Sequence, residues 1–233
     1  MWRLIGTLIL LSASPFVWSN ETEQTEQTEQ TEGGEISAQN SPHFSPQTNR
    51  FEEGRDYFSY VEPITELAKA DGKILIQFFF DYDCRICSSA LDILELYSQI
   101  NRDKVTLREY PVATAKDPFS ANVFFALQGI NAEPLSATLL FETAEKQRYG
   151  ELSRLEDLRQ WLQQQGVDDK EFMRQYSSAA VKQKIKQAIE KTEEYGVFTF
   201  PYVIINGKYV LTASTLYNDE YSFAVLDFLV NQK

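Results

Sequence analysis

The chain contains 233 residues and has a formal net charge of −12, because 34 acidic residues outnumber 22 Lys and Arg. Removing residues 1–49 leaves 28 acidic and 21 basic residues, a net charge near −7. An acidic surface does not attract phosphate backbones or anionic membranes, so the composition argues against nucleic acid as a partner. The remaining length suffices for one domain with a sizeable core, or for a small domain carrying an insertion.

The first 19 residues have the pattern of a secretory signal peptide. Arg3 precedes an apolar stretch from Leu4 to Leu11, and a cleavage site follows before Asn20. The apolar stretch is too short and too interrupted for a comfortable membrane span, which needs about 20 apolar residues. We therefore expect export to the periplasm, with tethering to the membrane by an uncleaved signal as the alternative.

Residues 20–49 have the composition of a solvated linker. A repeat of Glu, Gln and Thr covers residues 21–32, and small or polar residues dominate the rest. Low hydrophobicity and like charge prevent such a segment from building a core. We expect a disordered, low-complexity linker without chemistry of its own, followed by a folded domain over residues 50–233.

An apolar run over residues 73–80 predicts a buried strand, because it is short and rich in β-branched and aromatic residues. A weaker strand is expected near residues 56–61. From Cys87 to about Asn101, apolar residues recur at steps of three and four, which predicts an amphipathic helix. A third strand at residues 105–112 completes a β-β-α-β opening.

Cys84 and Cys87 are the only cysteines, and they stand between the predicted strand and helix. We expect both in the first helical turn, where free N–H groups and the macrodipole favour the thiolate that attacks disulfides. Cys84 would then hold a mixed disulfide, and Cys87 would resolve it. A zinc site is disfavoured, since it needs more ligands and the one histidine, His43, lies in the expected linker. A local structural bridge is the other alternative.

The hydrophobic period is helical from about residue 115 to residue 195. Residues 118–127 and 134–143 predict two short helices in this block. Its aromatic and Leu positions follow helical spacing, which is more typical of a core than of a cofactor pocket.

Two longer helices are expected in the second half of the block. Ser153 and Glu156 match a capping box ahead of a helix that ends at Gly166. Asp168 is expected to begin one long helix that ends at Gly196.

A hairpin and a helix are predicted at the C-terminal end. Residues 202–205 form a strand pattern, and Asn206-Gly207 tolerates the positive φ of a tight turn before a return strand at 208–211. A final amphipathic helix passes through Phe223 and Leu229. The order of elements is therefore β-β-α-β, a helical block, then β-β-α.

This order, with a signal peptide and a Cys-x-x-Cys motif at the first helix, resembles the DsbA family of exported thiol-disulfide oxidoreductases. Residues 51–57, 76–79 and 196–209 carry the similarity. The resemblance implies an α/β, thioredoxin-like fold with an inserted helical domain. The thioredoxin core would comprise about residues 50–114 and 196–233, and the insertion about residues 115–195.

The resemblance also assigns roles to residues outside the Cys-x-x-Cys motif. It implies that Pro201 is a cis-proline facing the dithiol, and that the backbone of Thr199 and Phe200 pairs with a substrate strand. The alternative, from the residues alone, is an ordinary proline at the first position of a strand. Gln77 is the nearest counterpart of a carboxylate that the family often buries beneath the dithiol.

The residues between the cysteines depart from the family, whose members commonly carry Pro and His there. Here these positions hold Arg85 and Ile86, and Asp81 and Asp83 lie close to Cys84. A negative charge near a partly exposed sulfur opposes the thiolate by roughly 1 kcal/mol. We therefore expect Arg85, Ile86 and Asp83 to tune the dithiol. Cys84 should be less acidic, and the disulfide less oxidising, than in the family's strongest oxidants.

The sequence thus predicts an exported oxidoreductase that introduces disulfides into unfolded or reduced exported proteins through Cys84 and Cys87. The resemblance implies reoxidation by a quinone-linked membrane protein, and no cofactor or metal is expected. No dimerisation segment of the kind found in isomerases precedes the fold, so we expect a monomer. The first alternative is a disulfide reductase or isomerase with the same dithiol. The second is a non-enzymatic, peptide-binding folding helper with a structural Cys84–Cys87 bridge.

Overall fold

A computed structural model describes residues 50–64, 69–70 and 72–232 of the chain. The predicted signal peptide and linker, residues 1–49, lie outside the described residues. Among the residues that are described, no helix has both the length and the apolar character needed to cross a membrane.

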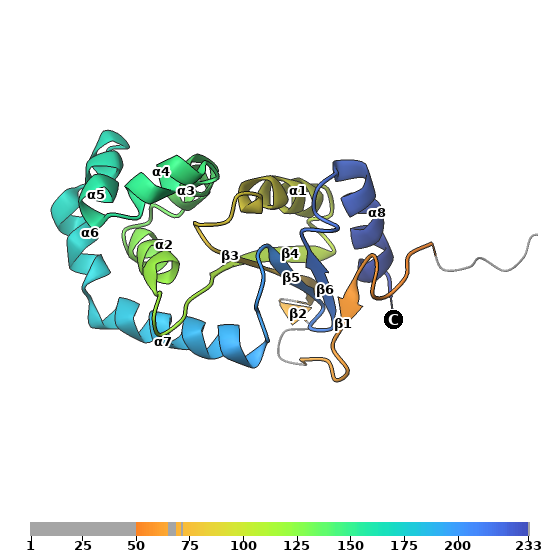
Figure 1. Ribbon diagram of the computed structural model, residues 1–233. Coiled ribbons are helices and arrows are strands. Elements are labelled where there is room, and N and C mark those ends of the chain that lie inside the picture. Colours follow the sequence, from red (N-terminus) through yellow and green to blue (C-terminus); the bar gives the residue numbers. More distant parts are fainter. Residues whose placement is uncertain (1–49, 65–68, 71, 233) are drawn as a thin grey trace, which may run out of the picture. The chain divides into compact units, whose positions relative to one another are not determined.

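A mixed sheet of six strands forms the centre of the described chain (Figure 1). β3 (Lys73–Phe80) pairs with β4 (Val105–Pro111) in parallel and with β5 (Tyr202–Ile205) in antiparallel orientation. Every residue of β3 from Leu75 onward is buried, which confirms the predicted apolar strand. β1 is shorter than expected, and β2 was not predicted. The remaining strands are β1 (Phe58–Ser59), β2 (Lys69–Ala70) and β6 (Tyr209–Thr212).

The side chains of β3 alternate between the two faces of the sheet, as strand geometry requires. Phe78 and Phe80 join the main hydrophobic cluster, which includes buried residues of α1 (Cys87–Ile100) and α8 (Asp219–Val230). Figure 1 shows these two helices side by side on one face of the sheet. Phe79 belongs to a second cluster on the opposite face. That cluster also contains Val112, Tyr195, Val197, Tyr202, Ile204 and Val210.

A block of helices lies between β4 and β5, within the range predicted for the insertion. The first two, α2 (Phe119–Gly129) and α3 (Pro134–Thr143), agree closely with the prediction. Buried residues of the block belong to the same cluster as those of α1, so the core is continuous from the sheet into the block. The division of the chain into domains stays a prediction. The other helices are α4 (Lys146–Leu152), α5 (Leu155–Gln164), α6 (Asp169–Tyr176) and α7 (Ala179–Glu194).

The predicted capping box at the start of α5 is wrong. Arg154 occupies the N-cap position of α5, and no described side chain caps that end. Ser153 instead follows the last residue of α4, a helix that the sequence analysis missed. Glu156 forms an ion pair with Arg159 one turn along α5 at 3.0 Å, so its carboxylate is not directed to the helix start.

The long helix expected after Asp168 consists of two helices, α6 and α7. Asp168 does begin the first of them, because its side chain accepts a hydrogen bond from the Glu171 N–H at 2.8 Å. Ser178 then begins the second, since its hydroxyl accepts from the Val181 N–H at 3.1 Å. A serine that hydrogen-bonds the backbone in this way starts a new helix instead of continuing the old one.

The predicted hairpin between β5 and β6 is confirmed. Asn206 and Gly207 have φ values of +54° and +64°, and both residue types adopt this region at low cost. Two consecutive positive φ values match the twist of the flanking strands. The turn pairs Ile205 with Tyr209 and brings β5 back into the sheet beside β3.

Hydrogen bonds of Asp56 connect the beginning of the folded domain to its C-terminal part. Only 3% of the residue is exposed, and its carboxylate accepts hydrogen bonds from the Glu52 N–H and from Arg55. The Tyr221 hydroxyl of α8 is a third donor. The Asp56 backbone C=O accepts from the Thr215 hydroxyl at 2.6 Å. The Arg55 hydrogen bond is the main reason why the pKa of Asp56 falls to about 2, because it favours the charged carboxylate.

We predict that Asp56 contributes to stability at neutral pH and that this contribution is lost in acid. Its pKa lies near 2 in the folded protein against an ordinary value of 3.8, so the unfolded state takes up its proton first as the pH falls. The contribution should be complete above about pH 5 and should disappear as the pH falls toward about 2. Asp56→Asn should lower the free energy of unfolding near neutral pH by roughly 1–3 kcal/mol.

Urea unfolding at several pH values measures this effect. Asp56→Asn should unfold at a lower urea concentration than the parent protein at neutral pH, and the difference should shrink in acid. Asp103→Asn, which removes an exposed carboxylate, is the matched control and should leave the curve unchanged. An Asp56→Asn protein with the parental acid dependence would contradict the prediction.

Candidate active site

Cys84 and Cys87 form a disulfide in the connection from β3 to α1, with 5.4 Å between their Cα atoms. Cys87 is the first residue of α1, but Cys84 precedes the N-cap residue Ile86, so the expectation that both lie in the helix is wrong for Cys84. A turn holds the first cysteine, because its N–H donates to the Asp81 C=O at 3.1 Å. The disulfide nevertheless holds the Cys84 sulfur at the N-terminus of α1.

The N-terminus of α1 presents a partial positive charge to the two sulfur atoms. Ile86 has no side-chain acceptor to cap the free N–H groups, and the first turn contains no acidic residue. A helix end of this kind favours negative charge. It therefore stabilises a thiolate that forms on either cysteine when the disulfide opens.

The two sulfur-bearing residues differ in their access to solvent. Cys84 is 5% exposed, whereas Cys87 is 0% exposed. An incoming thiol thus meets Cys84 first, so Cys84 is the residue suited to carry a mixed disulfide and Cys87 the one suited to resolve it. Ile86 lies between the two cysteines and is 42% exposed, so a client that approaches Cys84 meets an apolar side chain beside it.

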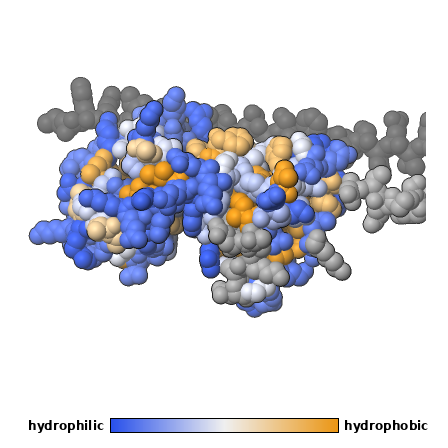
Figure 2. Space-filling view, turned by 90° about the horizontal axis from the view of Figure 1, so that it is seen from below, coloured by the Kyte–Doolittle hydropathy of each residue, from blue (hydrophilic) through white to orange (hydrophobic). Residues whose placement is uncertain are grey.

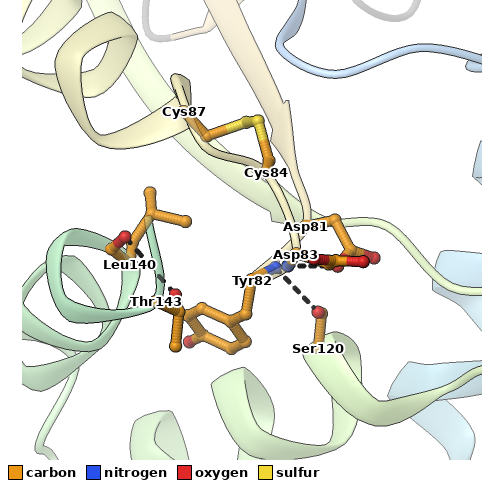
Figure 3. The surroundings of a disulfide bond; sticks show 8 residues. All are labelled: Asp81, Tyr82, Asp83, Cys84, Cys87, Ser120, Leu140 and Thr143. Atoms are coloured by element: carbon orange, nitrogen blue, oxygen red, sulfur yellow. Dashed lines mark hydrogen bonds between the residues drawn. A yellow bond between two sulfur atoms is a disulfide. The ribbon is translucent and has the colours of Figure 1, made fainter. Parts of the chain in front are cut away.

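Three carboxylates gather at the connection that carries Cys84. Asp81 accepts a hydrogen bond from the Asp83 N–H at 2.8 Å, and Figure 3 shows both side chains near Cys84, on the part of the segment that precedes it. Burial raises the pKa of Asp81, and the nearby charges of Asp117 and Asp83 add to this effect. Asp117 comes from the residues before α2, so the sequence analysis had no means to place it here. The charges of Asp81 and Asp83, which belong to the connection itself, oppose a thiolate on Cys84.

Arg85 does not neutralise these carboxylates. Its side chain is exposed, and within the described part of the chain it takes part in no ion pair. The charges of Asp81 and Asp83 therefore act on the site without a close cation from the motif. The roles of Arg85, Ile86 and Asp83 in tuning the dithiol stay predictions.

Tyr82 fastens the dithiol connection to the helical block. Its N–H donates to the Ser120 hydroxyl of α2 at 3.0 Å, a bond drawn in Figure 3. Its own hydroxyl lies 2.8 Å from that of Ser136 on α3, and the side chain is fully buried. The position of Cys84 thus depends on two helices of the block. The role of Tyr82 was not predicted, because an aromatic residue between two aspartates carries no signal of where it will be buried.

The peptide bond between Phe200 and Pro201 is cis, the form that the family resemblance implied. Pro201 is buried and immediately precedes Tyr202, which pairs with Phe79 near the end of β3. The proline therefore lies at the end of the sheet from which the dithiol connection departs. Among the described residues, no backbone–backbone hydrogen bond involves Thr199 or Phe200. Their role in substrate pairing stays a prediction.

Gln77, the expected counterpart of a carboxylate beneath the dithiol, does not point toward the dithiol. Gln77 is fully buried, but it alternates with Phe78 and so points to the face opposite α1. Neither polar atom of its amide has a hydrogen-bond partner among the described residues. On the α1 face, Glu109 of β4 lies in register with Phe78. Burial raises the pKa of Glu109 to about 7, and the charge of Glu95 on α1 adds to the shift.

Comparison with known proteins adds independent information. The DSBA-like thioredoxin domain family matches residues 120–221. An uncharacterized protein of Haemophilus influenzae is 62% identical over 85% of this chain and 85% of its own length. The thiol:disulfide interchange protein DsbA of Burkholderia cepacia is 28% identical over 77% of this chain and 84% of its own. The crystal structure of Pseudomonas aeruginosa DsbA shares the fold, with a TM-score of 0.65 at 23% identity, covering 77% of this chain and 93% of that chain.

We predict that removing one carboxylate beside the dithiol makes the Cys84 thiol more acidic. In reduced Asp81→Asn, the pKa of Cys84 should fall by roughly half a unit to one unit, because a nearby charge contributes about 1 kcal/mol at a partly exposed site. The same change stabilises the reduced form and should raise the redox potential by roughly 20 mV.

The ultraviolet absorbance of the thiolate as a function of pH measures the first quantity, and equilibration with glutathione measures the second. Asp103→Asn removes an exposed carboxylate beyond the other end of α1 and serves as the control. An unchanged or higher Cys84 pKa in Asp81→Asn would show that the carboxylate does not act on the sulfur.

Proposed function

Because this chain belongs to the DsbA family of thioredoxin-like proteins, we propose that it is an exported thiol:disulfide oxidoreductase that introduces disulfides into reduced proteins. One observation carries the proposal: the Cys84–Cys87 disulfide lies at the uncapped start of α1, and of its two residues only Cys84 retains exposure. A bridge between residues three apart removes little freedom from the unfolded chain, so a purely structural role explains it poorly.

In the oxidising direction, a client thiolate attacks Sγ of Cys84, and the bond between Cys84 and Cys87 breaks. Cys87 leaves as a thiolate, which the N-terminus of α1 stabilises. A second client thiolate then attacks the client sulfur of the mixed disulfide and releases Cys84 as a thiolate. The client loses two electrons, which remain on the reduced dithiol, and the two thiol protons pass to the dithiol or to solvent.

The segment before β5 is proposed to hold the client next to the dithiol. The backbone groups of Thr199 and Phe200 have no backbone partner among the described residues, so they are free to pair with an extended client segment. Pro201, which lacks an N–H, ends this segment at the start of β5. Pairing through the backbone would accept many client sequences, as a general oxidant requires.

Reduced or unfolded exported proteins are the proposed clients, and the periplasm is the proposed location. An oxidising compartment outside the cytoplasm would let the disulfide persist. Recycling requires a partner that accepts two electrons from the reduced dithiol, and a quinone-linked membrane protein is the proposed oxidant. The protein would act as a monomer, released after cleavage of its signal or tethered to the membrane without cleavage.

A disulfide reductase or isomerase is the second candidate, and the carboxylates near Cys84 favour it. Asp81 and Asp83 destabilise the thiolate of the reduced enzyme relative to a site without them. A less stable reduced form makes the dithiol a better electron donor. The redox potential therefore decides the direction in which the same exchange runs.

We predict that the oxidised protein restores activity to reduced, unfolded ribonuclease, and that Cys84→Ala and Cys87→Ala both lose this ability. Mixed with scrambled, disulfide-containing ribonuclease, reduced Cys87→Ala should also accumulate a mixed disulfide at Cys84, visible by mass spectrometry and removed by a reductant, because the Cys84 thiolate attacks a client disulfide and the resolving thiol is missing. Ser89→Ala, an exposed change in the first turn of α1, is the control and should retain activity. Ribonuclease refolding by Cys84→Ala at the parental rate would instead favour a fixed structural bridge.

Equilibration in glutathione buffers separates the two enzymatic candidates. For an oxidase moderated by nearby carboxylates, we expect a potential between about −200 and −130 mV, above the level of thioredoxin at about −270 mV. A value below about −250 mV would assign the protein to the reductases.

A further inference from the structure

A cavity of about 440 Å³ lies between the edge strand β4 and the helices α2 and α7. None of the residues from Asp81 to Cys87 lines it, so it is distinct from the dithiol site. Figure 2 views the molecule from the side on which α7 lies, and hydrophobic residues appear there among hydrophilic ones. The side chains that matter most for its chemistry are Arg108, Glu109, Tyr110, Phe125, Lys184 and Lys191.

Three cations line this cavity without a carboxylate partner. The Lys191 ammonium lies 5.0 Å from the centre of the Tyr110 ring, and that of Lys184 lies 5.5 Å from the centre of the Phe125 ring. Neither lysine, nor Arg108, forms an ion pair with any described residue. Positive charge thus lies against aromatic walls, where a bound anion would be partly shielded from water.

Glu109 adds a polar group that lacks a partner. Its Oε2 atom is buried and has no hydrogen-bond partner among the described residues. Burial raises the pKa of Glu109 to about 7, so near neutral pH a large fraction of the carboxyl is protonated and carries an O–H donor. A buried donor without an acceptor is unfavourable, so a ligand that supplies an acceptor oxygen is favoured.

We propose that this cavity binds an apolar carboxylate, either a free aromatic acid or the C-terminal residue of a peptide. Lys184 and Lys191 attract the carboxylate, the protonated carboxyl of Glu109 donates a hydrogen bond to one of its oxygens, and the rings of Tyr110 and Phe125 contact the apolar part. When Glu109 is protonated, Glu133 is the one carboxylate left in the cavity lining, and the three cations outnumber it. The same three cations would repel an amine ligand.

Titration calorimetry of the oxidised, full-length protein with 3-phenylpropanoate tests the proposal. The neutral 3-phenylpropanamide should bind at least about tenfold more weakly, because it lacks the charge that the lysines recognise. N-acetyl-Ala-Ala-Phe with a free or an amidated C-terminus forms the second pair. Tighter binding of the free peptide than of 3-phenylpropanoate identifies peptide C-termini as the source, and the reverse order identifies free acids.

Lysine variants connect the affinity to this cavity. Lys184→Gln and Lys191→Gln should each weaken binding of 3-phenylpropanoate by about fivefold, since each removes one charge from the wall. Lys182→Gln is the matched control, because Lys182 is exposed on the same helix and lies outside the lining. It should leave the affinity unchanged. Equal effects of all three variants would place the binding elsewhere and overturn the proposal.

The pH dependence tests the role of Glu109. In the parent protein, affinity should fall between about pH 6 and pH 8, because Glu109 becomes anionic and repels the ligand. Glu109→Gln keeps a donor but does not titrate, so its affinity should be nearly constant over this range. The other charged groups near Glu109 are Arg108, Glu133 and the two lysines of the wall, together with Glu95 on α1. Burial and the nearby charge of Asp92 also raise the pKa of Glu95, but Glu109→Gln removes the titration of Glu109 alone.

Two results would overturn the proposal directly. One is equal affinity for the carboxylate and its neutral amide, and the other is no measurable binding of any probe up to about 10 mM. Circular dichroism of Glu109→Gln checks its folding, and the lysine variants decide the outcome if that variant does not fold. All of these measurements use the oxidised protein without turnover, so they are independent of disulfide exchange.

Discussion

The site depends on how the chain leaves a fully buried strand and enters a helix within a short connection. β3 is buried as far as Phe80, and α1 begins at Cys87. Tyr82 controls the path between them, because its backbone contacts α2 and its hydroxyl contacts α3. A fully buried aromatic side chain with both polar groups satisfied resists displacement. The position of Cys84, two residues later, follows from that anchor.

Two opposing electrostatic effects meet at the sulfur atoms. The uncapped N-terminus of α1 favours a thiolate, while the carboxylates of Asp81 and Asp83 oppose it. Each contribution is on the order of 1 kcal/mol. The redox behaviour of the dithiol is thus a small difference between terms of similar size. This balance explains how one fold can serve oxidation or reduction with the same pair of cysteines.

The helical block takes part in the chemistry and does not merely cover the sheet. It supplies Ser120 and Ser136, which hold the dithiol connection, and the segment before α2 supplies Asp117. With β4, its helices α2 and α7 also enclose the cavity next to Glu109. Because the core is continuous from the sheet into the block, movement of either part would displace residues of the site.

The amino-acid pattern alone determined the elements whose signals are local. The apolar run of β3, the helix that begins at Cys87, the hairpin at Asn206-Gly207 and the cap at Asp168 were all predicted, since each depends on neighbours in the chain. Tertiary structure decided the rest. Contacts between segments far apart in sequence decide three features of the site region. These are which carboxylates lie near the dithiol connection, the direction of Gln77 away from the dithiol, and the burial of Glu109. Periodicity specifies which face of an element is apolar, but it carries no information on which distant element will cover that face.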